Sequence, residues 1–379
     1  MAIYCDYNAT TPLDPAVREA MAPFLEGVWG NPSSVHQIGR AARAALDDAR
    51  YRLAGLWKCR PSEVVFTSGG TEANNLAVLG AARRLSGRGR HLITSPVEHP
   101  AVLHAHRQLE RLEGFQVTEL PVDAAGRVDP QSVVDAIRPD TVLVSVMAAN
   151  NEVGTLQPVA EIGRLCRERG ICFHTDAVQA FGKLPWTDIH QFQADLVAVC
   201  AHKFHGPKGA GALYIRSPLQ PESLLVGGGH ENERRAGTEN LAAIAGLVEA
   251  FARFVPTPVF DPVRLDLWTR QLAATAAAVP GVTLRSPEVG RLANTVAFSV
   301  ADADSVTLLA VLDLAGICAS GGSACSAGSL EPSHVLKAMG VPGPECNALV
   351  RLSLGRETTE AEVARVLSAL PEVIRQVRR

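Results

Sequence analysis

The chain has 379 residues, 47% of them hydrophobic, and a formal net charge of −3. A chain of this length exceeds what one hydrophobic core normally serves, so we expect two domains. Without a long basic run, this charge argues against nucleic acid or an anionic membrane surface as the main partner. These properties favour a protein that acts on a small molecule.

The N-terminal residues lack the basic and apolar regions of a secretory signal. The most apolar predicted helix, residues 241–255, contains Glu249 and Arg253 and is too short to cross a bilayer. We therefore expect a cytoplasmic protein with no membrane partner.

The eight cysteines form neither a disulfide scaffold nor paired C-x-x-C metal clips. Five lie in or beside apolar segments, where a buried role is expected for most: Cys5, Cys166, Cys172, Cys200 and Cys318. The polar surroundings of Cys59 and Cys346 favour surface loops.

In chain order, β-branched apolar runs alternate with amphipathic helices, which predicts an α/β fold with a mostly parallel sheet. Seven strands are expected, at residues 64–67, 91–95, 116–120, 141–147, 171–175, 196–200 and 211–215. Helices are expected between them, at residues 72–85, 100–112, 130–137 and 159–169.

The proline-rich run 255–259 marks a boundary, after which we expect a smaller α+β domain. Its predicted elements are a helix at 262–278, a strand at 294–300, a helix at 305–315, a short strand, a helix, a strand at 349–354 and a final helix from Thr359.

Two of the predicted strands lead to residues that suit pyridoxal phosphate. Asp176 ends the strand at 171–175, where a carboxylate could keep a pyridine nitrogen protonated. Lys203 follows the strand at 196–200 and could form a Schiff base. A turn aspartate and a solvated lysine explain these two residues equally well when they are considered alone.

A phosphate site is suggested by residues 64–72, which read as a strand, a glycine turn and a helix start. Gly69 and Gly70 allow close approach of the backbone, and Ser68 and Thr71 add hydroxyl donors. A plain tight turn is the alternative.

Other polar residues follow predicted strands at the edge where parallel sheets bind ligands, namely His99, Asn151 and Gln179. His99 could lie on a cofactor ring and move protons, or it could simply cap the helix that begins at Pro100. His104 and His106 are two residues apart on that helix and share no face, so we interpret both as surface residues and expect no metal site.

Motifs along almost the whole chain resemble those of cysteine desulfurases of the NifS/IscS type, within the class V aminotransferase fold. The resemblance rests on residues 6–12, 30–34, 67–72, 150–154, 174–179, 202–203, 234–240 and 323–334. It implies a pyridoxal-phosphate-dependent transferase of fold type I (aspartate aminotransferase-like). The large domain, with its mostly parallel seven-stranded sheet, would be residues 15–254, and the smaller α+β domain residues 1–14 and 255–379.

The resemblance also implies roles for single residues in a homodimer. Lys203 would carry the cofactor, Asp176 would pair with the pyridine nitrogen, Gln179 with the ring hydroxyl, and His99 would stack on the ring. The phosphate would be held by Gly70, Thr71, Cys200 and His202, with Thr238 reaching in from the second subunit. At Cys200, housekeeping relatives carry serine, which puts its side-chain bond in doubt. Asn151 and Arg351 would bind the substrate carboxylate.

Cys325 sets the expected reaction. It lies in the small, polar stretch 320–329, which is typical of a loop. The resemblance implies that its thiolate takes sulfur from L-cysteine, leaving L-alanine and a persulfide that passes to an iron–sulfur scaffold protein or another acceptor. The variants at 177–180 and 235–240 look closer to the nitrogen-fixation branch. Three alternatives stay open: a selenocysteine lyase, a class V aminotransferase and an inactive scaffold subunit.

Overall fold

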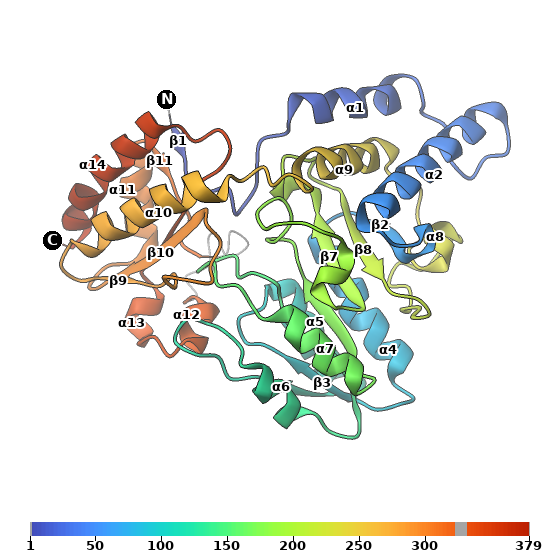
Figure 1. Cartoon of the computed structure of the whole chain (residues 1–379), viewed down its shortest axis with the longest axis horizontal. Helices are drawn as coiled ribbons and strands as arrows, with labels where there is room; N and C mark the ends of the chain where they lie inside the picture. The colour runs from blue at the N-terminus through green and yellow to red at the C-terminus, as the bar shows by residue number, and fades with distance from the viewer. Residues whose placement is uncertain (1, 323–331, 379) are drawn as a thin grey trace.

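The computed structural model describes residues 2–322 and 332–378, and its largest element is a seven-stranded sheet (Figure 1). The strand order is β2-β8-β7-β6-β5-β3-β4. Strand β8 runs antiparallel to β2 and β7, and the other neighbours are parallel. All seven predicted strands are present: β2 (Val64–Thr67), β3 (His91–Thr94), β4 (Gln116–Glu119), β5 (Thr141–Ser145), β6 (Cys172–Asp176), β7 (Leu196–Cys200) and β8 (Gly211–Ile215).

Helices cover both faces of this sheet, because its central strands are buried along their whole length. They are α1 (Pro15–Glu26), α2 (Gln37–Trp57), α3 (Gly70–Asn75), α4 (Ala81–Leu85), α5 (Pro100–Glu113), α6 (Pro130–Ala136), α7 (Val159–Glu168), α8 (His230–Glu233) and α9 (Leu241–Phe254). Short 3-10 turns occupy Pro61–Glu63, Ile189–Phe192 and Ala201–Lys203. The helix predicted at 72–85 is divided by a π-helical turn at Leu76–Gly80.

A second, antiparallel sheet has the order β12-β10-β9. Its strands are β9 (Val282–Leu284), β10 (Thr295–Val300) and β12 (Leu349–Ser353), and the accompanying helices are α10 (Pro262–Ala277), α11 (Ser305–Leu314), α12 (His334–Ala338), α13 (Gly343–Cys346) and α14 (Glu360–Val377). The N-terminal strand β1 (Ile3–Tyr4) pairs in parallel with β11 (Ile317–Cys318), so the start of the chain lies beside this second sheet (Figure 1).

The parallel strands bring distant residues to one edge of the large sheet, since their carboxyl ends point the same way. Strand β6 ends at Asp176, and β7 ends at Cys200, three residues before Lys203. His99 precedes α5 after strand β3.

Two expectations about buried residues were wrong. His106 is buried because it falls on the inner stripe of α5 with Val102, Ala105 and Leu109. Its Nδ1 lies 2.9 Å from the Val102 carbonyl oxygen, and burial lowers the pKa of the imidazole to about 4. Cys346 is also buried, at the end of α13. Across the described ranges, no helix is both long and apolar enough to cross a membrane.

Candidate active site

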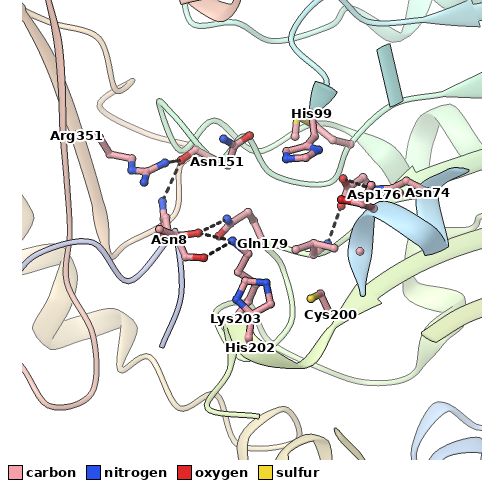
Figure 2. Close-up of a pocket in the computed structure, with 15 residues that line it drawn as sticks. Asn8, Asn74, His99, Asn151, Asp176, Gln179, Cys200, His202, Lys203 and Arg351 are labelled. Carbon is pink, nitrogen blue, oxygen red and sulfur yellow. Dashed lines mark hydrogen bonds between the residues drawn. The ribbon is translucent and has the colours of Figure 1, made fainter. Parts of the chain in front are cut away.

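Ten of the residues predicted for the site line one cavity of about 180 Å³ at the carboxyl edge of the large sheet (Figure 2). They are Gly70, Thr71, His99, Asn151, Asp176, Gln179, Cys200, His202, Lys203 and Arg351. The cavity therefore collects side chains from segments nearly three hundred residues apart in the sequence.

Lys203 lies in the short turn that follows β7, and it points into the cavity (Figure 2). Its Nζ donates hydrogen bonds to the backbone carbonyl oxygens of Asn8, at 2.8 Å, and Ala9, at 2.6 Å. The N-terminal segment therefore fixes the position of the amine.

Asp176 is almost fully buried, and its two carboxylate oxygens are held separately. Oδ2 accepts from Asn74 Nδ2 at 2.7 Å, and Oδ1 accepts from the backbone N–H of Val178 at 3.0 Å. Behind them, His174 Nε2 lies 3.1 Å from Asn74 Oδ1. Burial lowers the pKa of His174 to about 3, so its neutral ring donates to Asn74.

His99 caps α5, as one interpretation predicts, and it also lines the cavity, where its role on a cofactor ring stays a prediction. Its Nδ1 accepts from the backbone N–H of Ala101 at 3.1 Å, which places the proton of the neutral ring on Nε2. Burial lowers the pKa of His99 below its usual value, against the opposing charge of Asp176. A neutral imidazole is the form that can accept a proton.

The residues expected around a phosphate share one end of the cavity, next to the glycine turn. A Cβ on Gly70 would lie 3.0 Å from Val178 Cγ2, so a larger residue there would crowd the Val178 side chain. Burial raises the pKa of the Cys200 thiol, while the Gly70 N–H donates to its sulfur. Burial lowers the pKa of His202 to about 3, and its Nδ1 lies 3.1 Å from Thr10 Oγ1. This glycine turn, together with Lys203 and Asp176, fits pyridoxal phosphate.

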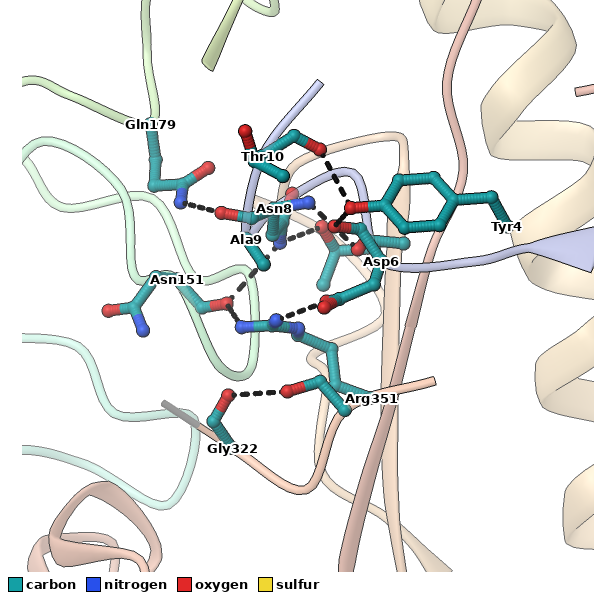
Figure 3. A network of polar contacts seen from close by, with 12 residues as sticks. Tyr4, Asp6, Asn8, Ala9, Thr10, Asn151, Gln179, Gly322 and Arg351 are labelled. Carbon is teal, nitrogen blue, oxygen red and sulfur yellow. Dashed lines mark hydrogen bonds and ion pairs between the residues drawn. The ribbon is translucent and has the colours of Figure 1, made fainter. Parts of the chain in front are cut away.

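Arg351 is fully buried on β12 and contacts two other parts of the site (Figure 3). Its Nη1 donates to the Asn151 carbonyl oxygen at 2.7 Å, and its Nη2 pairs with Asp6 Oδ1 at 2.6 Å. Its Nε has no hydrogen-bond partner among the described residues. A buried unpartnered donor beside a cavity suits a substrate carboxylate.

The other two predicted site residues are Thr238 and Cys325. Thr238 lines a separate hollow that also touches Ser68, on the chain's own surface. Its predicted reach into a second subunit stays a prediction. Cys325 lies outside the described residues.

Residues on either side of that segment nevertheless contact the site. Ser320 exchanges backbone hydrogen bonds with Arg351, at 3.1 and 2.6 Å. Ser333 Oγ donates to Glu152 at 2.6 Å, and His334 Nε2 lies 2.9 Å from the Glu98 carbonyl oxygen, next to His99.

Sequence reasoning gave no role to several residues that build the site, including Asn8, Asn74 and Lys183. Asn8 lies within the motif at residues 6–12, and it contacts Thr295 on β10 and Gln179, which follows β6. Asn74 falls four residues after Gly70 on the same helical run, a spacing that would have placed it on the same face. In the ranges 2–322 and 332–378, no group of three or more potential metal ligands is clustered.

Comparisons with known proteins agree with this geometry. A family model described as aminotransferase class-V matches residues 3–366. The chain belongs to this family, in its branch of NifS/IscS-type cysteine desulfurases. A protein of Dictyoglomus turgidum called cysteine desulfurase IscS is 45% identical over 377 residues, which cover 99% of this chain and 95% of that protein. One of the same name from Methanosarcina thermophila is 45% identical, over 100% of this chain and 93% of its own length.

Solved structures show the same fold. A NifS-like protein superposes with a TM-score of 0.91 at 35% identity, covering 99% of this chain and all of its own. The structure of SspA in complex with cysteine gives a TM-score of 0.82, also at 35% identity, and covers 94% of this chain and 100% of its own.

Proposed function

We propose that the protein removes sulfur from L-cysteine with pyridoxal phosphate, giving L-alanine and a persulfide on Cys325. The observation that carries the proposal is the meeting of Lys203, Asp176 and Arg351 in one cavity. A lysine to attach the cofactor, a carboxylate for its pyridine nitrogen and a guanidinium for the substrate carboxylate are the groups this chemistry requires. The names of the relatives support the same substrate.

Pyridoxal phosphate, when bound, withdraws electrons from the substrate α-carbon. Asp176 would keep the pyridine nitrogen protonated, and Asn74 and the Val178 N–H hold its carboxylate in place. The Nζ of Lys203 would take the proton from the substrate α-carbon. The carbonyl groups of Asn8 and Ala9 hold this amine in position for that step.

The substrate carboxylate would bind at Arg351, which lines the cavity and whose Nε is buried without a partner among the described residues. Asn151 contributes its backbone oxygen to the same guanidinium. This contact fixes the orientation of the substrate and places its sulfur on a defined side of the cavity.

Cys325 would attack the substrate sulfur as a thiolate. A sulfur–sulfur bond forms, the carbon–sulfur bond breaks, and its electron pair stays on the carbon, which is then protonated to give alanine. The neighbouring residues Ser320 and Ser333 support this role, because they contact Arg351 and Glu152 beside the cavity. His99 Nε2 would accept the thiol proton after giving up its own, because the Ala101 N–H occupies Nδ1.

The proposed enzyme has two domains, acts as a homodimer and passes its sulfur to an acceptor. Packing of Ile3, Cys5 and Tyr7 against residues 260–374 supports a small domain made of residues 1–14 and 255–379 beside a large domain of 15–254. The functional unit would be a homodimer in which Thr238 reaches the partner's phosphate site. The persulfide sulfur would pass to an iron–sulfur scaffold protein or a similar acceptor.

The test compares the wild type with Cys325→Ala and Lys203→Ala, each with L-cysteine and a reductant, and measures sulfide and alanine. Equal amounts of both products are expected from the wild type, and neither from Lys203→Ala. Cys59→Ala and Lys208→Ala are matched controls, because Cys59 and the exposed Lys208 lie outside the cavity. Substantial sulfide from Cys325→Ala would rule out the persulfide route and favour another activity of this fold.

A further inference from the structure

Lys183 is a buried lysine next to the cavity that the proposed reaction does not use. Its side chain is only 5% exposed. Its Nζ donates to Asn8 Oδ1 at 2.8 Å and to Gln179 Oε1, and it lies 5.2 Å from the centre of the Phe260 ring. Burial, together with the charges of Lys203 and Arg351, holds the pKa of Lys183 well below its usual range.

The contacts of Gln179 determine which end of its amide faces which neighbour. Its Nε2 lies 2.9 Å from the backbone carbonyl oxygen of Asn8, which can only accept a hydrogen bond. Its Oε1 receives a hydrogen bond from Lys183. One N–H of the amide is used on Asn8, and the second remains for the cavity that Gln179 lines. Because an ammonium and a neutral amine both have at least two N–H groups, Lys183 can hold this arrangement in either charge state.

Asn8 connects the same lysine to Lys203. Its backbone oxygen accepts from Lys203 Nζ at 2.8 Å (Figure 2). Its Oδ1 accepts from Lys183 Nζ. On the other side of the residue, Asn8 Nδ2 donates to Thr295 Oγ1 at 2.9 Å and to the Asn151 carbonyl oxygen at 3.3 Å (Figure 3). Both ends of the Asn8 side chain are therefore fixed, and Lys183 holds the Oδ1 end together with Asn294 Nδ2, at 3.1 Å.

We propose that Lys183 is a positioning residue for the cofactor. It orients the Gln179 amide so that an N–H donor faces the oxygen of the ring hydroxyl of pyridoxal phosphate, and it fixes the Asn8 carbonyl that holds Lys203. This inference rests on the proposed function. A donor at the oxygen of the ring hydroxyl stabilises negative charge on that oxygen. This charge is greatest once the bound cofactor has lost the proton that titrates in its visible spectrum. Lys183 therefore lowers the pH at which the visible absorption of the bound cofactor changes.

The test is a pH titration of the visible spectrum of the holoenzyme, with Lys183→Met and Gln179→Leu. Each variant should raise the midpoint of the spectral titration by about half a pH unit or more. Each should also weaken the binding of pyridoxal phosphate by about fivefold or more. In the double variant, Lys183→Met should add less than its full single-variant shift to that of Gln179→Leu, because the lysine acts in part through the glutamine. A fully additive shift, or a wild-type midpoint in Lys183→Met, would overturn the proposal.

Phe260→Leu is the matched control, because it alters packing on Lys183 and leaves both of its hydrogen bonds possible. Its midpoint should equal that of the wild type even where its melting temperature falls, and a shift as large as that of Lys183→Met would overturn the proposal. Should Lys183→Met fail to fold, Lys183→Gln replaces it. The shorter amide cannot span both acceptors, so a raised midpoint supports the proposal and a wild-type midpoint overturns it.

A wild-type protein that gives no visible band with added pyridoxal phosphate would contradict the proposed function itself. A normal wild-type band with an unchanged Lys183→Met titration would contradict only the role of Lys183. The two failures are therefore distinguished in the same experiment.

Discussion

Asn74 Nδ2 lies 2.7 Å from Asp176 Oδ2, and both side chains are buried. His174 fixes the direction of this contact, because its neutral ring donates to Asn74 Oδ1 and leaves the amide N–H for the carboxylate. A carboxylate intended for a pyridine nitrogen must stay ionised in a buried place, and hydrogen bonds to the charged form favour that state. Asn74 therefore serves the site without binding substrate.

Asn74→Ala should weaken pyridoxal-phosphate binding and lower stability by about 1–3 kcal/mol, because a buried carboxylate oxygen loses its donor. Asn74→Asp should be worse, since it places two carboxylates side by side. Spectroscopic titration with the cofactor and thermal melting measure the two effects. Asn75→Ala removes an amide from the same helical run but outside the cavity, and it should change cofactor affinity much less. Equal losses in Asn74→Ala and Asn75→Ala would contradict this role.

Gly211→Ala should displace the glycine turn at Gly69 and Gly70, because Gly211 packs against Gly69. A Cβ on Gly211 would lie 2.7 Å from Gly69 Cα and 2.8 Å from the Val199 carbonyl oxygen, so the backbone has to move. Overpacking of this kind costs about 1–3 kcal/mol, and the moved turn should bind pyridoxal phosphate about tenfold more weakly. Melting curves and cofactor titrations measure both.

Gly55→Ala is the matched control for Gly211→Ala. Gly55 lies inside α2, and a Cβ there would meet nothing within 4 Å. This variant should gain about 0.5–1 kcal/mol of stability and keep its cofactor affinity. Normal affinity in Gly211→Ala would show that the turn tolerates the shift.

How far the sequence predicts this structure depends on the kind of contact involved. The strands were predicted because their residues are continuously apolar, as in Leu196–Cys200, where prediction and structure coincide. The helices α1 and α2 were not among the predicted elements. The π-helical turn at Leu76–Gly80 was not predicted either, because the pattern of apolar residues does not distinguish it from an α-helix.

His106 was missed although a signal was present. Val102, Ala105 and Leu109 stand at helical spacing around it, which places position 106 on the inner face. The polar side chain of His106 favours the surface and the periodicity favours burial, and the fold follows the periodicity.

The contacts between Asn8 and Lys183 and between Asp6 and Arg351 could not have been found in this way. They join segments 175 and 345 residues apart, and neither spacing nor composition reports which distant polar side chains meet. The motifs that resemble the family did mark most residues of the cavity, because the chemistry restricts their types. The residues that hold those groups in place became visible only in the folded chain.

Glu98 should make stability depend on pH. Burial raises its pKa to about 8, and its Oε1 accepts from Ser95 Oγ at 2.6 Å and from the Met147 N–H at 2.8 Å. An unfolded glutamate titrates near ~4.3, so between this pH and about 8 the unfolded chain has lost a proton that the folded protein keeps. The free energy of unfolding therefore falls as the pH rises through this window.

Glu98→Gln removes this titration and keeps an oxygen for both donors. The melting temperature of the wild type, relative to that of Glu98→Gln, should decrease from about pH 5 to about pH 8 and then level off. Thermal melting of both holoenzymes across this range is the measurement. A difference that stays constant with pH would mean that Glu98 is already ionised in the folded protein.

Arg351→Lys should affect substrate binding more than the chemical step. The guanidinium of Arg351 lines the cavity while it contacts Asp6 and Asn151, and the single ammonium of lysine cannot reproduce its planar set of donors. The loss of a bidentate carboxylate contact should raise KM for L-cysteine about 10- to 100-fold, with a smaller change in kcat. Arg356→Lys is the matched control, because Arg356 forms partly exposed ion pairs with Asp14 and Glu357, outside the cavity. Exposed pairs contribute about 0–1 kcal/mol, so its KM should stay near that of the wild type. Steady-state kinetics with L-cysteine separate the two variants, and a normal KM in Arg351→Lys would assign the substrate carboxylate to another residue.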